Sequence, residues 1–345
     1  MGVYARALAE ALGENYELQL HDEWRGPAPP EVVADLAICH GWRQDRYAAF
    51  DSAAFARGVT RDRAGNVLVV PFDTTLLHPA QIDQLDELFG TFWVDSELSA
   101  RRIRAAGLHR AHVEVIPPPL VLPPTGEQPD RRKAGSDYAF LHVATGSPRV
   151  KGTDILLRAY AKVRDRYPAA SLTILTGSKA PEAATIREMI ARHVSPPHRP
   201  SIALAADSVE HAAMQRLYRE SDCCVLCSRS ETFGLPALEA AAAGIPVIMH
   251  RHVGAAEHRE HFLHVLSSGE MRTMPAGVWR NNRPSRWFEA SVAEMSELMM
   301  SCLRSRPGAP RAQGADLVRR YGPGAFGEAL EGLVEGCLER RKVVC

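Results

Sequence analysis

Strand-like and helix-like segments alternate through the second half of this 345-residue chain, and that alternation restricts its fold more than any other feature. Residues 139–145 (AFLHVAT) form an apolar run, and the segment after it, Thr153–Tyr167, carries apolar residues at helical spacing with Thr153 as the expected N-cap. Further strand-like runs at SLTILTG, SIALAA, DCCVLCS and PVIMH alternate with helical segments near 181–192, 209–220 and 235–243. Near-continuous apolar strands separated by helices predict an α/β fold, with a parallel sheet covered on both faces.

The first half repeats this alternation more weakly. Strand-like runs at YELQL, ADLAICH, NVLVVPF, TFWVDS and HVEVIP are interleaved with helical segments near 3–12, 79–89 and 97–106. This half opens on a helix, so the strand that normally starts a doubly wound unit is missing or lies upstream. We therefore expect two Rossmann-like, doubly wound parallel-sheet domains, the N-terminal one abbreviated, that face each other across a ligand-binding cleft.

A Pro-rich stretch separates the two halves. Residues 117–137 contain Pro117, Pro118, Pro119, Pro123, Pro124 and Pro129. Such a segment is typical of an extended linker rather than of a core element. The predicted organisation is an N-terminal domain (1–120), a linker (121–136), a second domain (137–320), and a C-terminal helix (321–345) that could return to the N-terminal domain.

Composition excludes several classes of protein. The 41 Lys and Arg residues balance 41 Asp and Glu residues, whereas a nucleic-acid-binding protein usually carries a basic excess. The best apolar stretch is interrupted by Glu239 and falls short of the roughly 18 residues of a spanning helix. The N-terminal residues lack the basic and then apolar pattern of a secretory signal, so we expect a cytoplasmic protein. Seven scattered cysteines, an odd number, imply no disulfide framework.

A histidine-rich segment, HRHVGAAEHREHFLH, raises the question of a metal site. It contains five histidines, with Glu257 one helical turn before His261. However, neither of the metal-binding patterns HExxH and HxxEH is present, so we predict no metal site and interpret the segment as a solvated polar helix face.

The most informative string is LYRESDCCVLCSRSETFGLPALEAAAAGIPVI (217–248), in which seven residues separate Glu231 from Glu239. Glu231 ends a strand-to-helix loop at the carboxyl edge of the expected sheet. Gly234 has no Cβ, so the backbone N–H groups near it can approach a ligand closely. Pro236 suits the start of a helix, whose N-terminus favours an anion such as a diphosphate. Glu239 lies about one turn into that helix, where it can bridge a diol.

This string closely resembles the retaining glycosyltransferases of family 4, which adopt the two-domain GT-B fold. The resemblance implies that Glu231 contacts hydroxyl groups of a donor sugar and that Glu239 holds the ribose of a nucleotide. It also implies that the intervening loop faces the diphosphate and the sugar. The implied donor-binding residues of that loop are Thr232, Phe233, Gly234 and Leu235.

Two other segments resemble the same family. SPRVKGTDILLRAY (147–160) is similar to its Lys-Gly-x-Asp helix start, which implies that Lys151 neutralises the diphosphate. The family's additional arginine is one residue out of register here, and Arg149 is the candidate substitute. ADLAICHGW resembles the strand that ends in a histidine near the sugar, which implies a catalytic role for His40 beside Glu231 and Lys151.

The resemblance implies a metal-independent, retaining transferase that uses a nucleotide-diphosphate sugar as co-substrate and needs no other cofactor. A UDP-sugar is favoured as the donor, and the acceptor is a small molecule, a glycan or a lipid-linked hydroxyl compound. The arginines near 101–110 could contact a membrane surface, and the oligomeric state is open. Three alternatives remain: a pseudo-glycosyltransferase, a sugar-nucleotide epimerase, and a non-catalytic sugar-nucleotide sensor.

Overall fold

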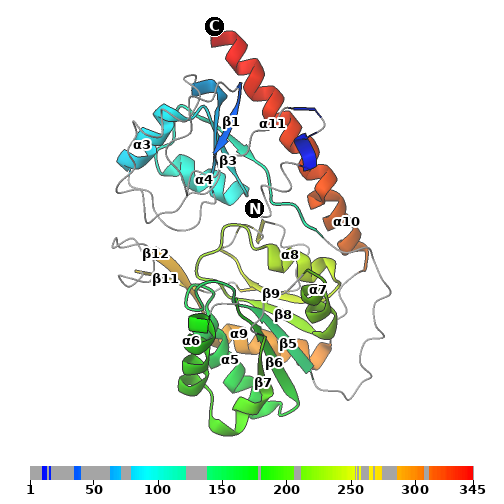
Figure 1. Cartoon of the computed structure of the whole chain (residues 1–345). Helices are drawn as coiled ribbons and strands as arrows, with labels where there is room; N and C mark the ends of the chain where they lie inside the picture. The colour runs from blue at the N-terminus through cyan, green and yellow to red at the C-terminus, as the bar shows by residue number, and fades with distance from the viewer. Residues whose placement is uncertain are drawn as a thin grey trace. The chain divides into compact units, whose positions relative to one another are not determined.

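The computed structural model in Figure 1 divides the chain into two compact units. It describes residues 10–13, 15–16, 35–39, 63–70, 79–121, 138–177, 180–205, 211–252, 254, 256–257, 264–266, 269–273, 286–306 and 311–344. Unit 1 comprises Met1–Pro119, Pro275–Ser285 and Tyr321–Cys345. Unit 2 comprises Leu120–Met274 and Arg286–Arg320. Each unit is described separately below.

Unit 2 is built on a six-stranded parallel sheet. Its strands are β5 (Tyr138–Val143), β6 (Ala170–Leu175), β7 (Ile202–Ala205), β8 (Cys223–Leu226), β9 (Val247–His250) and β10 (His264–Leu266). Their spatial order is β10-β9-β8-β5-β6-β7, so the chain first winds outward on one side of β5 and then returns to build the other side. This is the doubly wound order of a Rossmann-like domain, and it confirms the predicted α/β class.

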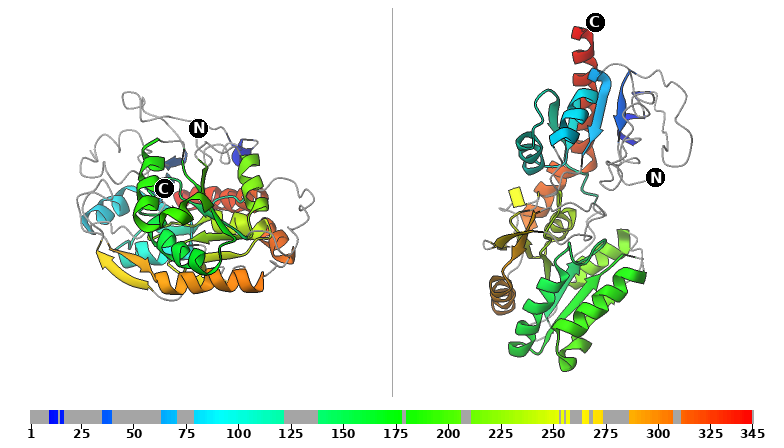
Figure 2. Two further views of the ribbon diagram at one scale, coloured as in Figure 1. Left: turned by 90° about the horizontal axis from the view of Figure 1, so that it is seen from below. Right: turned by 90° about the vertical axis from the view of Figure 1, so that its left-hand side faces the viewer.

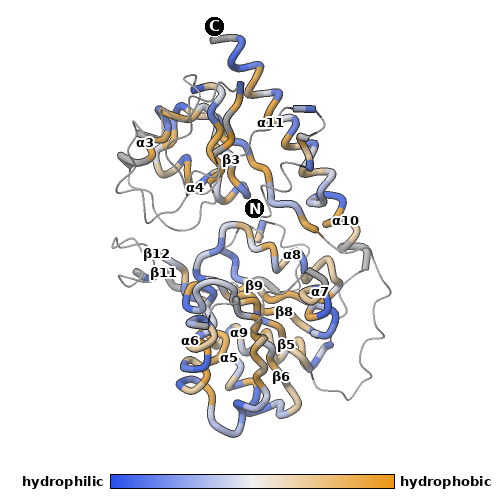
Figure 3. The backbone as a smooth tube through the Cα atoms, in the orientation of Figure 1, coloured by the Kyte–Doolittle hydropathy of each residue, from blue (hydrophilic) through white to orange (hydrophobic). Residues whose placement is uncertain are grey.

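Helices cover both faces of this sheet (Figure 2). They are α5 (Thr153–Arg166), α6 (Ala180–His193), the 3₁₀ helix η3 (Pro196–Ser201), α7 (His211–Glu220), α8 (Leu235–Ala242) and α9 (Val292–Ser305). The apolar face of α5 packs on the sheet, where Leu156, Tyr160 and Val163 are fully buried. Strands with two covered faces should be apolar throughout, and Figure 3 shows hydrophobic residues along β5, β6 and β8.

An antiparallel hairpin in unit 2 has no counterpart in the sequence-based prediction. It consists of β11 (Gly269–Thr273) and β12 (Arg286–Ala290), which lie between β10 and α9 in the chain. The histidine-rich segment is also placed differently from the prediction in part. His250 ends the buried strand β9 instead of lying on a solvated helix, because the apolar run before it continues the sheet.

Unit 1 contains a four-stranded parallel sheet, of order β1-β2-β3-β4. The strands are β1 (Ala37–Cys39), β2 (Asn66–Val69), β3 (Thr91–Val94) and β4 (His112–Val115). The helices of this unit are η2 (Arg63–Gly65), α3 (Pro79–Leu88), α4 (Glu97–Ala105) and α11 (Pro323–Val344), and α10 (Arg311–Tyr321) precedes α11. Leu68, Phe92 and Ile103 share one buried cluster, so the sheet packs against the helix that follows β3.

The C-terminal helix α11 supplies one side of the unit 1 core. Phe326 and Leu330 are buried in the same cluster as Val67 and Trp93 of the sheet. The rings of Trp93 and Phe326 lie 5.8 Å apart, and the indole N–H of Trp93 donates a hydrogen bond to the Ile116 carbonyl. The core on this side of the sheet is therefore completed by a helix more than 200 residues further along the chain.

Within the described part of the chain, no helix has the length and apolar character needed to cross a bilayer.

The packing of α11 predicts the effect of a single truncation. Leu330→Ala should lower the free energy of unfolding of unit 1 by about 2–5 kcal/mol, because Leu330 is fully buried and its loss leaves a cavity. Chemical denaturation followed by circular dichroism measures this change. Glu335→Ala, an exposed position on the same helix, is the control and should leave the midpoint nearly unchanged. Equal midpoints for the two variants would contradict this packing.

Candidate functional site

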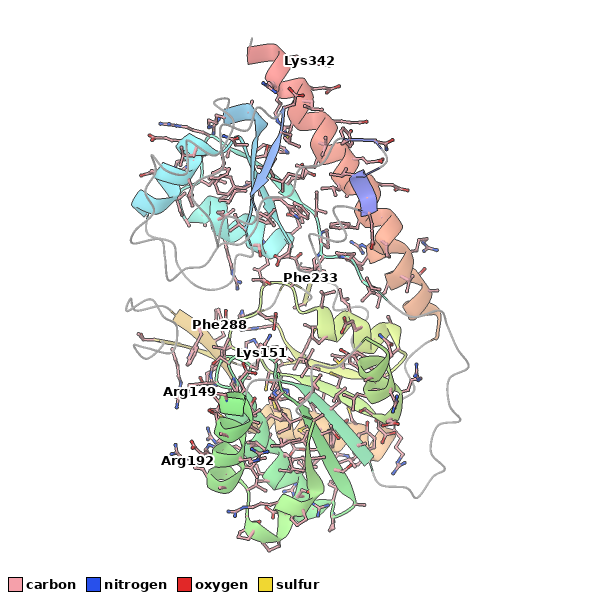
Figure 4. The ribbon with its side chains drawn as sticks, viewed as in Figure 1. Arg149, Lys151, Arg192, Phe233, Phe288 and Lys342 are labelled. Carbon is pink, nitrogen blue, oxygen red and sulfur yellow. The ribbon has the colours of Figure 1, made fainter. Side chains whose placement is uncertain are left out.

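In unit 2, the loops after β5 and β8 begin side by side, because these two strands are neighbours in the sheet. These strands are adjacent in the sheet, but the chain leaves β5 towards β6 and leaves β8 towards β9 on the other side. The loops that follow them therefore diverge, and ligands of open α/β sheets bind in the crevice that results. Lys151 comes from the loop after β5 and Glu231 from the loop after β8. Arg149, Lys151 and Phe233 of these two loops are labelled in Figure 4.

A small pocket opens at this point. It is lined by Val143, Lys151, Leu226, Ser228, Glu231, Gly234, Pro236, Ala237 and Met249. The apolar members come mainly from the ends of β5, β8 and β9, and the polar members come from the loops. Apolar side chains and a few polar groups thus line this pocket together.

The two predicted charged residues of the pocket form an ion pair with each other. The ammonium group of Lys151 donates a hydrogen bond to Glu231 Oε2, and the hydroxyl of Ser228 approaches the same oxygen at 3.4 Å. The side chains of Lys151 and Glu231 are 19% and 20% exposed. A negatively charged ligand that enters the pocket would therefore compete with Glu231 for Lys151.

The helix that follows Glu231 presents its N-terminus to the pocket. Its N-cap is Gly234, which has a φ of 89° and provides no side chain to cap the helix. Pro236 contributes no N–H, and the N–H of Ala237 bonds to the Gly234 carbonyl. Anion binding by this turn would therefore depend on the amides of Gly234 and Leu235, assisted by the helix dipole.

Helix α5 begins against the neighbouring loop. Its N-cap is Gly152, with a φ of 72°, and a Cβ at this position would collide with the carbonyl oxygen of Cys227. The buried thiol of Cys227 in turn donates to the Gly152 carbonyl at 3.1 Å. Only glycine meets both the backbone conformation and the space here, so Lys151 is held next to the loop after β8.

The predicted N-cap role of Thr153 is wrong. Thr153 is the first residue of α5, and its hydroxyl lies 3.1 Å from Nε2 of the fully buried His142. His142 Nδ1 lies 2.8 Å from the Val225 carbonyl, which can only accept, so Nδ1 carries the proton and Nε2 accepts from Thr153. Burial lowers the pKa of His142 to about 4, which keeps the ring neutral. Thr153 thus fixes α5 to the sheet.

Arg229 forms a buried ionic cluster that sequence reasoning missed. Its guanidinium makes two parallel hydrogen bonds to Asp154, at 2.6 and 2.8 Å, and two to Glu289 of β12, at 2.6 and 2.8 Å. It also donates to the Arg149 carbonyl and lies over the ring of Trp287. Hydrogen bonds from Arg229 hold the pKa of Asp154 below its ordinary value, although burial opposes that shift.

This cluster joins three segments around the pocket: the loop after β5, the loop after β8, and the hairpin strand β12. One acidic partner, Asp154, is the aspartate of the Lys-Gly-x-Asp string, so the sequence offered a signal for it. The second partner, Glu289, is 60 residues from Arg229 and lies in a hairpin that apolar periodicity did not reveal.

The second predicted glutamate lies further along α8. Glu239 is half-buried and accepts a hydrogen bond of 2.7 Å from the hydroxyl of Tyr218 on α7. Of the other predicted positions, Arg149 is exposed, Thr232 and Leu235 are half-buried, and Phe233 is buried. His40 lies outside the residues that the structure describes. The structure therefore brings Lys151, Glu231 and Gly234 together in one pocket of unit 2.

The sequence matches the model of a known protein family. The sequence model of a family described as "Family 4 Glycosyltransferase in conflict systems" matches residues 97–301. Mannosylfructose-phosphate synthase of Agrobacterium fabrum is 26% identical over 156 residues, which is 43% of this chain and 34% of that protein. D-inositol 3-phosphate glycosyltransferase of Arthrobacter sp. is 30% identical over 150 residues, which is 41% of this chain and 34% of that protein. The chain thus matches about a third of the length of these curated relatives.

Comparison with solved structures supports the predicted GT-B fold. Anabaena Alr3699/HepE, crystallised with UDP and glucose, has a TM-score of 0.63 at 15% identity, over 87% of this chain and 78% of that one. The structure of apo OtsA has a TM-score of 0.58 at 13% identity, over 82% of this chain and 70% of that one. At these identities the likeness establishes the fold alone.

The Arg229 cluster predicts a large stability effect. Arg229→Met should lower the free energy of unfolding of unit 2 by about 3–5 kcal/mol, because it leaves two partly buried carboxylates without the buried cation that they share. Arg319→Met is the control, since Arg319 pairs with Asp316 in an exposed i,i+3 pair and should matter by less than about 1 kcal/mol. Urea denaturation measures both values. If the Arg229 cluster did not hold the loops, both variants would lower the free energy of unfolding by similarly small amounts.

Proposed function

The chain belongs to the family 4 glycosyltransferases of conflict systems, and we propose that it transfers a sugar from a nucleoside-diphosphate donor to a hydroxyl acceptor. We further propose that the configuration at the anomeric carbon is retained and that the donor is a UDP-sugar. The single observation that carries this proposal is the pairing of Lys151 with Glu231 at the point where the loops after β5 and β8 diverge.

The chemistry of the transfer explains why these residue types would meet here. A departing nucleoside diphosphate accumulates negative charge, and fixed positive groups stabilise it most effectively in a partly dry pocket. Lys151 would provide a full positive charge, and the N-terminus of α8 would add backbone amides and the positive end of its dipole. Arg149, which is exposed on the same loop as Lys151, would assist them.

The acidic residues would then bind the two ends of the donor. Once Lys151 turns to the diphosphate, the carboxylate of Glu231 would be released to accept hydrogen bonds from sugar hydroxyls. Glu239, further into α8, would bind the ribose, and His40 would lie near the sugar. In this mechanism the acceptor hydroxyl attacks the face that the leaving group vacates. The bond to the diphosphate breaks, and a phosphate oxygen takes the acceptor's proton.

Divalent ions are not required in this mechanism. The chain contains no Asp-x-Asp string, which is the usual carboxylate pair for a metal-bound diphosphate, and Lys151 would supply positive charge at the leaving group instead. No resident cofactor is needed either, because the nucleotide sugar is itself a co-substrate.

Variants of the ion pair test the proposed roles. Glu231→Gln should bind UDP roughly two- to fivefold more tightly, because Lys151 loses its competing partner and the pocket loses a negative charge. The same variant should transfer or hydrolyse the donor sugar on the order of 10²-fold more slowly, since an oriented contact to the reacting sugar is lost. Lys151→Met should instead weaken UDP far more than uridine. Calorimetry and donor-turnover assays measure these quantities.

Lys162→Met is the matched control for Lys151→Met, because Lys162 is exposed on α5, the helix that follows the Lys151 loop. If Lys151→Met weakened UDP and uridine equally, Lys151 would be a structural residue and the proposed donor site would be incorrect.

Metal removal provides an independent test. Donor turnover should stay within about twofold of its starting rate in saturating chelator, because protein groups supply the positive field around the diphosphate. The assay measures release of UDP before and after EDTA. Loss of turnover, followed by recovery on addition of a single divalent ion, would contradict the metal-independent mechanism.

A further inference from the structure

Tyr218 is a fully buried residue of unit 2 whose hydroxyl bonds to Glu239. It belongs to α7, the helix that leads into β8, whereas its hydroxyl reaches Glu239 on α8, the helix that follows β8. The oxygen–oxygen distance is 2.7 Å, a normal length for a hydroxyl that donates to a carboxylate. The hydrogen bond thus connects the helix that precedes β8 in the chain with the helix that follows it.

The direction of this hydrogen bond is fixed by its surroundings. Burial, followed by the nearby Glu239 carboxylate, raises the pKa of Tyr218 well above its ordinary value, so the hydroxyl stays protonated. A protonated phenol beside an ionised carboxylate can only donate, and Glu239 Oε2 therefore accepts. Cys224, also buried next to Glu239, keeps its proton for the same reasons.

The hydrogen bond restricts where the carboxylate can lie. A glutamate side chain has three rotatable bonds, and ordering it when a ligand binds costs conformational entropy. Tyr218 is held by complete burial, so its hydroxyl is a fixed point for Glu239 before any ligand arrives. An ionised carboxylate still offers several lone pairs after accepting one hydrogen bond, and these can accept from a vicinal diol.

We propose that Tyr218 is a positioning residue for nucleotide recognition, and that its hydroxyl orients the Glu239 carboxylate towards the 2′- and 3′-hydroxyls of the donor's ribose. This inference rests on the proposed function, in which Glu239 binds that ribose. Through Tyr218, α7 would therefore help to select ribonucleotides over nucleotides that lack the diol. A merely structural Tyr218 would stabilise the fold without affecting that selection.

The test compares UDP with 2′,3′-dideoxy-UDP in the intact chain. Tyr218→Phe keeps the ring and removes only the hydroxyl. It should raise the dissociation constant of UDP roughly 5- to 20-fold, while that of dideoxy-UDP changes less than about twofold, because only the diol depends on Glu239. The ratio of the two constants, measured by calorimetry, is a quantity that loss of stability alone does not move.

Tyr160→Phe is the matched control. Tyr160 is also fully buried in unit 2, and its hydroxyl bonds to Ser201 Oγ at 2.8 Å and to the carbonyl of Ala170, at the start of β6 and so at the opposite end of the sheet. This variant should lose stability to a similar degree and keep the parent's ratio. Tyr218→Met, which also lacks the hydroxyl, serves if the phenylalanine variant does not fold.

Glu239→Gln separates failure of this inference from failure of the proposed function. If Glu239→Gln loses the preference for UDP while Tyr218→Phe keeps it, the ribose site stands and the role of Tyr218 is overturned. If the parent binds neither nucleotide, or if Glu239→Gln binds both as the parent does, the proposed ribose site itself fails and the inference fails with it.

Discussion

The candidate site depends on the ionic cluster in which the buried guanidinium of Arg229 pairs with two carboxylates. Beyond the end of the sheet, the loops after β5 and β8 are joined by a backbone hydrogen bond from the Arg229 N–H to the Val150 carbonyl. The Arg229 side chain bonds to Asp154 at the start of α5 and to Glu289 in β12, and so adds ionic connections to this backbone contact. Gly152 adds a second connection, since its lack of a side chain lets α5 start against Cys227. Lys151 is held between these two fixed points.

The charged residues near the pocket differ in whether a ligand can reach them. Arg229 is nearly inaccessible and satisfied by two carboxylates, so it can take little part in binding a ligand. Lys151 and Glu231 are partly exposed and have each other as partners. An incoming diphosphate would offer Lys151 a partner of greater negative charge than Glu231. The Arg229 cluster therefore holds the loops, while the Lys151–Glu231 pair lines the pocket where a ligand can reach it.

Much of this could be predicted from the sequence, and the exceptions have physical reasons. Periodicity predicted the α/β class and strands β5 to β9 of unit 2, because burial on both faces requires continuous apolar runs. It missed β10, which begins at His264 in the segment interpreted as a polar helix face. The spacing of Glu231 and Glu239, with Lys151 upstream, predicted residues that the topology then gathers beside β8 and α8. Periodicity did not reveal β11 and β12, or the partnership of Arg229 with Glu289, because ionic contacts between distant segments have no sequence period. Thr153 was expected to cap α5, whereas Gly152 is the N-cap and the Thr153 hydroxyl bonds to the buried His142.

A crystal structure of the chain with UDP would test the central claim most directly, namely that the point where the loops after β5 and β8 diverge is a diphosphate site. The account predicts a diphosphate oxygen within about 3 Å of the Lys151 ammonium group, with the Lys151–Glu231 hydrogen bond broken and the first turn of α8 facing the phosphates. A diphosphate bound elsewhere, or an intact Lys151–Glu231 pair with UDP beyond hydrogen-bond reach of Lys151, would contradict it.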